Sequence, residues 1–137
     1  MGLDAELLLH PEGPIARRIP GYESRPQQTA MVRAVDSALS SRRPLLIEAG
    51  TGTGKSFGYL LPAVRRVLEH EERVVVVTHT IALQEQLHDK DVPLIRSVVQ
   101  DEFSAVLVKG RNNYISRRRM ERTEQRADRL LSDPKAQ

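Results

Sequence analysis

Residues 49–56 read AGTGTGKS, and this octapeptide stands between an apolar run and a helical pattern. The run before it, LLI at 45–47, favours a buried strand, and the apolar positions of 55–70 recur at the spacing of a helix. The alternating glycines let the backbone bring successive N–H groups close to an anion, and the N-terminus of the following helix adds a favourable dipole. The octapeptide therefore predicts a loop that binds the phosphates of a nucleotide.

Two polar side chains give this loop its chemistry. Lys55 is the predicted catalytic residue, reaching the β- and γ-phosphates, and the Ser56 hydroxyl is predicted to coordinate Mg²⁺. A tight turn with a solvent-facing lysine is the structural alternative, although each glycine carries an entropic cost that such a turn does not explain. The residues predicted to bind the cofactor are Ala49, Gly50, Thr51, Gly52, Thr53, Gly54, Lys55 and Ser56.

The segments on either side predict an α/β fold. The unbroken run of valines at 74–77 is typical of a central parallel strand that is covered on both faces. Strands alternating with helices favour a parallel sheet flanked by helices. The expected strands are 45–47, 74–78 and 105–108, and the expected helices are 27–40, 55–70, one from about residue 80, and 92–101.

The two ends of the chain differ from this middle part. Residues 1–21 are interrupted by prolines and glycines and predict an irregular segment without elements of its own. From Lys109 onward arginines accumulate and large apolar residues become rare. The stretch 116–131 predicts a basic, mostly polar helix.

Composition excludes several classes of function. The 137 residues, 39% of them hydrophobic, suffice for one domain, and 21 basic against 18 acidic residues give a net charge of +3. Without cysteine the chain has no disulfide, thiolate zinc site or cysteine nucleophile. Aromatic residues make up 4%, so contact with nucleic acid should rest on charge and not on base stacking. No apolar run has the roughly 20 residues of a membrane span, and no secretory signal opens the chain, so a cytoplasmic location without membrane contact is expected.

Four blocks in order give the chain a resemblance to a known family over residues 22–119. It resembles the superfamily 2 DNA helicases of the DinG and XPD (Rad3-like) type, and it shares with them alanine at the first position of the phosphate loop. The resemblance implies a partial, truncated RecA-like P-loop NTPase domain that uses ATP and Mg²⁺ and moves along single-stranded DNA, 5′ to 3′, in DNA repair or replication. The blocks are YESRPQQTAMV at 22–32, IEAGTGTGKSFGYLLPA at 47–63, VVVVTHTIALQEQLHDKDVPLI at 74–95 and VLVKGRNNYISRRR at 106–119.

The resemblance assigns further residues to the nucleotide and to DNA. Gln28 matches the glutamine that recognises adenine, since an amide both donates and accepts hydrogen bonds, and Arg25 in the same block is assigned to the nucleotide. A polar residue at a helix start remains the alternative for Gln28, as does a loop histidine without a role for His79. The residues assigned to the DNA backbone are Thr78, His79, Thr80, Lys109 and Arg111.

The fourth block departs from the family at one position. Ser116 stands where these helicases have a cysteine of their iron–sulfur domain, and serine lacks the thiolate that binds iron. No cluster ligated by this chain is therefore expected. The resulting division is 1–21 irregular, 22–110 the N-terminal part of the RecA-like domain, and 111–137 the basic start of an inserted domain. The arginines after Ser116 either hold DNA phosphates or form a solvated charged helix.

The remaining question is whether the chain turns ATP over. No Asp-Glu-Ala-His motif follows the third expected strand, so the sequence is interpreted as the N-terminal part of a longer helicase. The 137 residues alone are expected to hydrolyse ATP little or not at all. A nucleotide- or DNA-binding module without turnover is one alternative. A P-loop kinase or GTPase-like switch is another, although it has no use for the blocks at 22–32 and 106–119.

Overall fold

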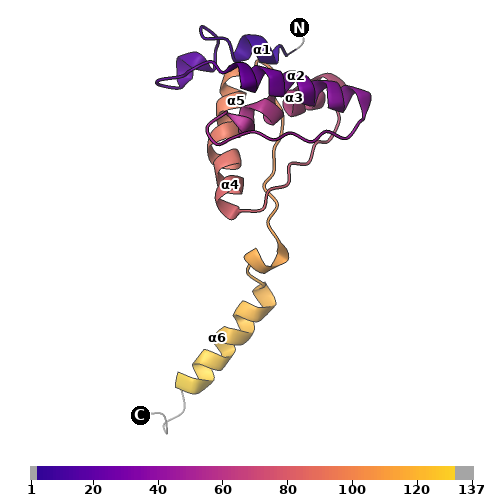
Figure 1. Ribbon diagram of the computed structural model, residues 1–137. Coiled ribbons are helices and arrows are strands. Elements are labelled where there is room, and N and C mark those ends of the chain that lie inside the picture. The colour runs from indigo at the N-terminus through magenta and orange to yellow at the C-terminus, as the bar shows by residue number, and fades with distance from the viewer. Residues whose placement is uncertain (1–2, 132–137) are drawn as a thin grey trace. The chain divides into compact units, whose positions relative to one another are not determined.

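The computed structural model describes residues 3–131, with side chains described up to residue 127, and every regular element in this range is a helix (Figure 1). The chain divides between Val106 and Leu107 into two compact units, and each is described by itself. No helix within 3–131 is long and apolar enough to cross a membrane.

Two long helices form the centre of the first unit. α2 (Pro26–Ser41) and α3 (Lys55–His70) pack against each other, and they confirm the helices predicted at 27–40 and 55–70. Proline suits the first turn of α2 because the N–H it lacks would have no partner there. The helices approach so closely that a Cβ on Gly58 would lie 2.7 Å from the Met31 sulfur. Their buried apolar faces supply Val32, Leu60, Leu61 and Val64 to the core.

The N-terminal segment corrects the prediction of an irregular stretch at 1–21. It contains α1 (Ala5–Leu8) and the 3₁₀ helix η1 (Ala16–Arg18). Asp4 caps α1, its carboxylate accepting from the N–H groups of the second and third residues that follow, at 3.0 and 3.1 Å. Leu9 and Ile15 are 2% and 0% exposed, so this segment belongs to the core. Helices this short fall below what apolar periodicity detects, and the capping aspartate was the signal that was missed.

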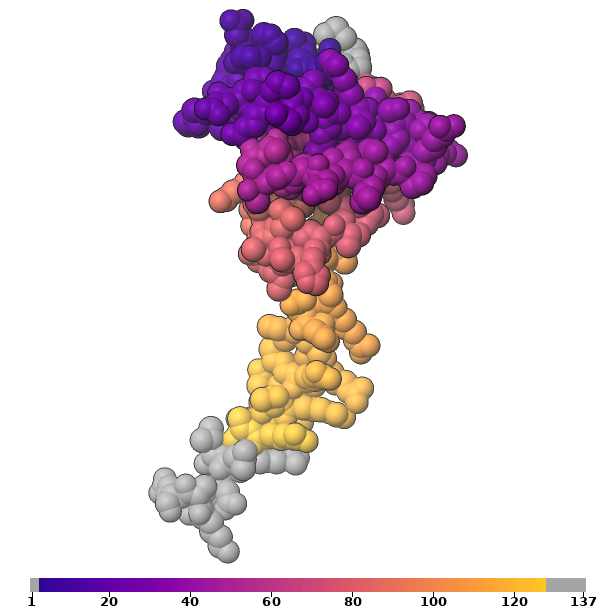
Figure 2. All heavy atoms as spheres, in the orientation of Figure 1, coloured from indigo at the N-terminus to yellow at the C-terminus, as the bar shows by residue number. Residues whose placement is uncertain are grey.

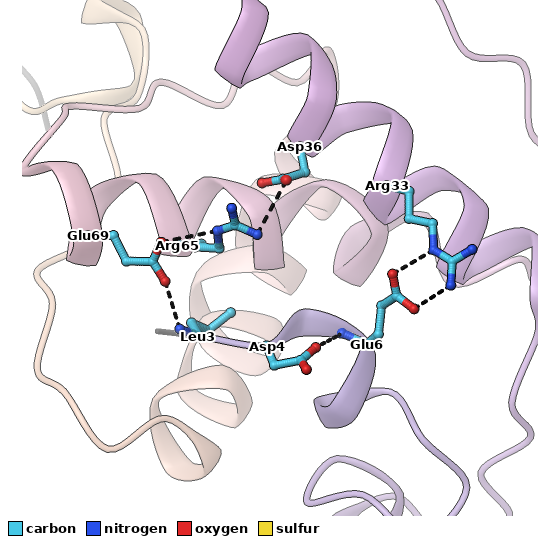
Figure 3. Close-up of polar contacts among 7 residues, drawn as sticks. All are labelled: Leu3, Asp4, Glu6, Arg33, Asp36, Arg65 and Glu69. Carbon is cyan, nitrogen blue, oxygen red and sulfur yellow. Dashed lines mark hydrogen bonds and ion pairs between the residues drawn. The ribbon is translucent and has the colours of Figure 1, made fainter. Parts of the chain in front are cut away.

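Charged side chains connect the N-terminal segment with both long helices (Figure 3). Arg33 donates two hydrogen bonds of 2.5 Å to the Glu6 carboxylate. Arg65 lies 3.3 Å from Asp36 and 3.2 Å from Glu69. Glu69 also accepts from the backbone N–H of Leu3 at 2.8 Å. In Figure 2 the indigo atoms of the segment adjoin the purple atoms of α2, in agreement with the contacts between α1 and α2.

A second run of helices completes the first unit. α4 (Ile81–Gln86), one π-helical turn η2 (Leu87–Asp91) and α5 (Val92–Val98) follow one another without a break. They confirm a helix starting near residue 80, while the helix predicted over 92–101 ends at Val98. Pro93 has no N–H to bond the carbonyl four residues earlier, which accounts for a change of hydrogen-bonding pattern just before it. Leu87 and Ile95 bury this run against the core.

The predicted parallel strands are not confirmed, because residues 3–131 contain no strand. The segments 45–47, 74–78 and 105–108 carry no regular structure, and a strand exists only where a ladder of hydrogen bonds joins it to a neighbour. Several of the side chains expected inside a sheet are open to solvent. Exposed fractions reach 98% at Leu46, 88% at Val77 and 83% at Val106.

The C-terminal end of α3 carries a buried cation. Arg66 is 9% exposed and donates to both carboxylate oxygens of Glu72, at 2.8 and 3.0 Å. This hydrogen-bonded guanidinium lowers the pKa of Glu72. The pair therefore fixes the point where the chain leaves α3 towards residues 74–78.

We expect Glu72→Gln to destabilise the chain at neutral pH, because it leaves the Arg66 charge buried without a counter-charge. A carboxylate with a lowered pKa stabilises the fold above its ordinary value of 4.5, and this contribution is lost as the pH falls through the lowered value. The difference in melting temperature between Glu72→Gln and wild type should therefore shrink towards acid pH. Glu102→Gln, at an exposed position, is the matched control. A difference independent of pH would contradict the assignment.

The second unit contains η3 (Arg111–Asn113) and α6 (Arg117–Leu131). α6 confirms the basic helix predicted at 116–131. The Tyr114 hydroxyl accepts from the backbone N–H of Lys109 at 2.9 Å, which closes the turn before the helix. All described side chains of α6, up to residue 127, are exposed.

Candidate nucleotide site

The predicted phosphate loop leads into α3 through two residues with left-handed backbone. Gly52 has φ of 79° and Gly54 has φ of 74°, a region that other residues rarely adopt. Gly54 is also the N-cap of α3, and a Cβ there would overlap the side-chain amide nitrogen of Gln28. Glycine at 54 is thus required by both backbone conformation and space.

The Lys55 side chain folds back over the loop that precedes it. Its ammonium group donates to the carbonyl oxygens of Ala49 at 3.0 Å and Gly50 at 2.6 Å. The Thr53 hydroxyl donates to the Gly50 carbonyl as well, at 3.0 Å. The Lys55 charge therefore lies against the glycine-rich loop that the sequence predicts to bind phosphate.

Ser56 lies in the first turn of α3 and is partly buried. Burial raises the pKa of Tyr59, which lies one turn later in the same helix. The Mg²⁺ role predicted for Ser56 fits a metal that keeps most of its water ligands, since one hydroxyl suffices. Within the described part of the chain, no group of three or more His, Asp or Glu side chains is arranged so that it could hold a metal ion.

Two residues from the start of α2 reach the loop. Gln28 is 5% exposed, and its Nε2 donates to the Gly54 carbonyl at 3.0 Å. Arg25 donates through Nη1 to the Gly52 carbonyl and lies 3.7 Å from Glu23. The structure thus brings together residues 26 or more positions apart that the sequence assigned to one nucleotide. Periodicity did not reveal that they contact the loop directly.

The residues predicted to contact DNA are not part of this cluster. The Thr78 hydroxyl accepts from the Thr80 N–H at 3.2 Å, and the Thr80 hydroxyl caps α4 by accepting from the Leu83 N–H at 3.3 Å. His79 between them is exposed. Lys109 and Arg111 belong to the second unit, where Arg111 begins η3. Their contact with DNA therefore stays a prediction.

The chain is similar to known helicases. The DEAD/DEAH box helicase family matches residues 25–134. The chain is 40% identical over 117 residues to the ATP-dependent DNA helicase YoaA of Escherichia coli. The aligned residues cover 85% of this chain and 17% of that protein. It is 42% identical over 99 residues to the ATP-dependent helicase DinG of Mycobacterium tuberculosis, and the aligned residues cover 69% of this chain and 15% of that protein. The 3′-5′ exonuclease DinG of Bacillus subtilis is 35% identical to it over 104 residues, which are 76% of this chain and 11% of that protein.

The chain thus spans less than a fifth of the length of these relatives. The family match includes the phosphate loop, α2 and most of the second unit. On the extent of this match, the chain belongs to the DEAD/DEAH box helicase family and is DinG-like within it.

Proposed function

We propose that this chain binds Mg²⁺-ATP and forms the nucleotide-binding part of an ATP-dependent helicase that moves along single-stranded DNA. The observation that carries the proposal is the convergence of Lys55, Gln28 and Arg25 on one glycine-rich loop. Lys55 holds the β- and γ-phosphates, Ser56 contributes to the Mg²⁺ shell and Gln28 reads the base. The relatives named ATP-dependent helicases support this reading.

In the intact domain, we propose that residues 45–47, 74–78 and 105–108 become parallel strands beside the described helices. Their β-branched and apolar side chains suit a sheet covered on both faces. Thr78, His79 and Thr80 would then stand at the carboxyl end of a strand, where α/β folds bind ligands. No iron–sulfur cluster is proposed for this chain, because it contains no cysteine to ligate iron.

The chain alone should bind ATP weakly and hydrolyse it little or not at all. Hydrolysis needs a positioned water and charge stabilisation besides phosphate binding, and these 137 residues contain no Asp-Glu-Ala-His motif. Calorimetric titration with Mg²⁺-ATP and a phosphate-release assay, each with and without single-stranded DNA, measure the two properties. Hydrolysis that Lys55→Ala abolishes would contradict the prediction. If the chain instead transferred the γ-phosphate of ATP to a bound acceptor molecule, that result would favour a kinase.

A DNA-binding module without turnover is the second candidate, favoured by the exposed arginines of α6. Each contact between an arginine and a single-strand phosphate changes the slope of log affinity against log salt by about 0.7. We expect Arg118→Gln with Arg119→Gln to reduce this slope by roughly 1.4. The matched control is Arg17→Gln with Arg18→Gln, two neighbouring exposed arginines in η1. Equal slopes for both double variants would contradict a role of α6 in DNA binding.

A further inference from the structure

One tyrosine lies between the N-terminal segment and the nucleotide site. The Tyr22 hydroxyl donates to the backbone carbonyl of Leu9 at 2.8 Å and lies 3.5 Å from the Gln28 side-chain oxygen. Gln28 in turn donates to the Gly54 carbonyl. A chain of three polar groups therefore leads from the N-terminal segment to the phosphate loop.

The Tyr22 hydroxyl directs its single proton at both oxygens in a bifurcated hydrogen bond, in which the Leu9 carbonyl is the nearer acceptor and Gln28 Oε1, at 3.5 Å, the more distant one. Burial raises the pKa of Tyr22, so the group keeps this proton at neutral pH. The Leu9 carbonyl is a fixed acceptor, because the Leu9 side chain is 2% exposed and Ile15 beside it in the core is fully buried. The tyrosine oxygen is thereby held in one place.

The neighbours of Gln28 allow one orientation of its amide. With Nε2 towards Gly54, the amide donates to a carbonyl oxygen and keeps its own oxygen beside Tyr22. Rotation by 180° would place the amide oxygen against the Gly54 carbonyl, two acceptors without a proton between them. Gln28 is 5% exposed, so such a contact between acceptors would be buried and costly.

We propose that Tyr22 is a positioning residue through which the N-terminal segment, residues 3–21, orients Gln28 towards the phosphate loop and the nucleotide base. The inference rests on the proposed binding of ATP. It assigns to a segment outside the phosphate loop a part in selecting the base. Tyr22 acts through Gln28 and does not itself touch the nucleotide.

The test is Tyr22→Phe, which removes the hydroxyl and keeps the ring. Tyr114→Phe, which removes the hydroxyl that accepts from Lys109 in the second unit, is the matched control. Two quantities are measured on the 137-residue chain: the ¹⁵N-resolved signal of the Gln28 side-chain amide without nucleotide, and the affinities for Mg²⁺-ATP and inorganic tripolyphosphate. In Tyr22→Phe we expect the Gln28 amide signal to shift and ATP affinity to fall roughly fivefold, with tripolyphosphate unchanged.

The outcomes separate this inference from the proposed function. An unshifted Gln28 signal in Tyr22→Phe overturns the positioning role, as does an equal loss for ATP and tripolyphosphate, which signals general destabilisation. A shifted signal with unchanged ATP affinity also overturns it. If the wild-type chain binds neither ligand, the proposed function fails for this chain, and the Gln28 signal still decides whether Tyr22 orients the amide.

Discussion

Replacing Lys55 with alanine should reduce the affinity for Mg²⁺-ATP by roughly 10- to 100-fold. A charge-assisted hydrogen bond contributes about 1.5–3 kcal/mol, and the structure places the Lys55 ammonium at the glycine-rich loop, in contact with two of its carbonyls. The variant also removes the two bonds that hold the carbonyls of Ala49 and Gly50. Calorimetric titration of the variant and wild type measures the effect.

Lys90→Ala is the matched control for this experiment. Lys90 lies exposed in η2 and donates to no part of the loop among the described residues. It should bind ATP as the wild type does. A loss in Lys90→Ala equal to that in Lys55→Ala would mean that net charge, and not the position of the ammonium group, governs binding.

Replacing Leu9 with alanine should lower the free energy of unfolding by about 2–5 kcal/mol, the range for a fully buried leucine. Leu9 is 2% exposed, whereas Leu7, two residues earlier in the same segment, is 61% exposed. Leu7→Ala should therefore change stability by less than about 0.5 kcal/mol. Urea unfolding monitored by circular dichroism measures both variants.

This matched pair tests whether the N-terminal segment is part of the folded core. Both variants replace leucine by alanine, so a change in the unfolded chain affects them alike. Two equally small effects would show that the segment is detached in solution. In that case the contact between Tyr22 and the Leu9 carbonyl would also be lost.

Sequence reasoning predicted the helices well because their signals are local. The apolar spacing within 27–40 and 55–70 predicted the limits of α2 and α3 to within one residue. The basic helix α6 was found in the same way. Helix hydrogen bonds join residues four apart, so a helix and the sequence pattern that predicts it occupy the same stretch of chain.

Local patterns were not sufficient for the strands, which the structure does not confirm, or for the N-terminal segment, whose short helices were not predicted. A sheet needs partners from elsewhere in the chain, so a run such as 74–77 shows that a strand is favoured but not that a partner is present. The burial of Leu9 and Ile15 likewise depends on helices that follow later in the sequence. For the site, the glycine and lysine pattern predicted the loop, whereas the contacts of Arg25 and Gln28 with it are long-range and became visible only in the structure.

Hydrogen exchange in the segments 45–47, 74–78 and 105–108 can reveal whether they have joined a sheet. Their backbone N–H groups have no ladder partners within residues 3–131, so their protons should exchange with solvent deuterium far faster than those of α2 and α3. Any chain segment that completed a sheet with them would slow this exchange at alternate residues along each run. Mass-spectrometric deuterium uptake at these residues thus follows formation of the sheet separately from formation of the helices.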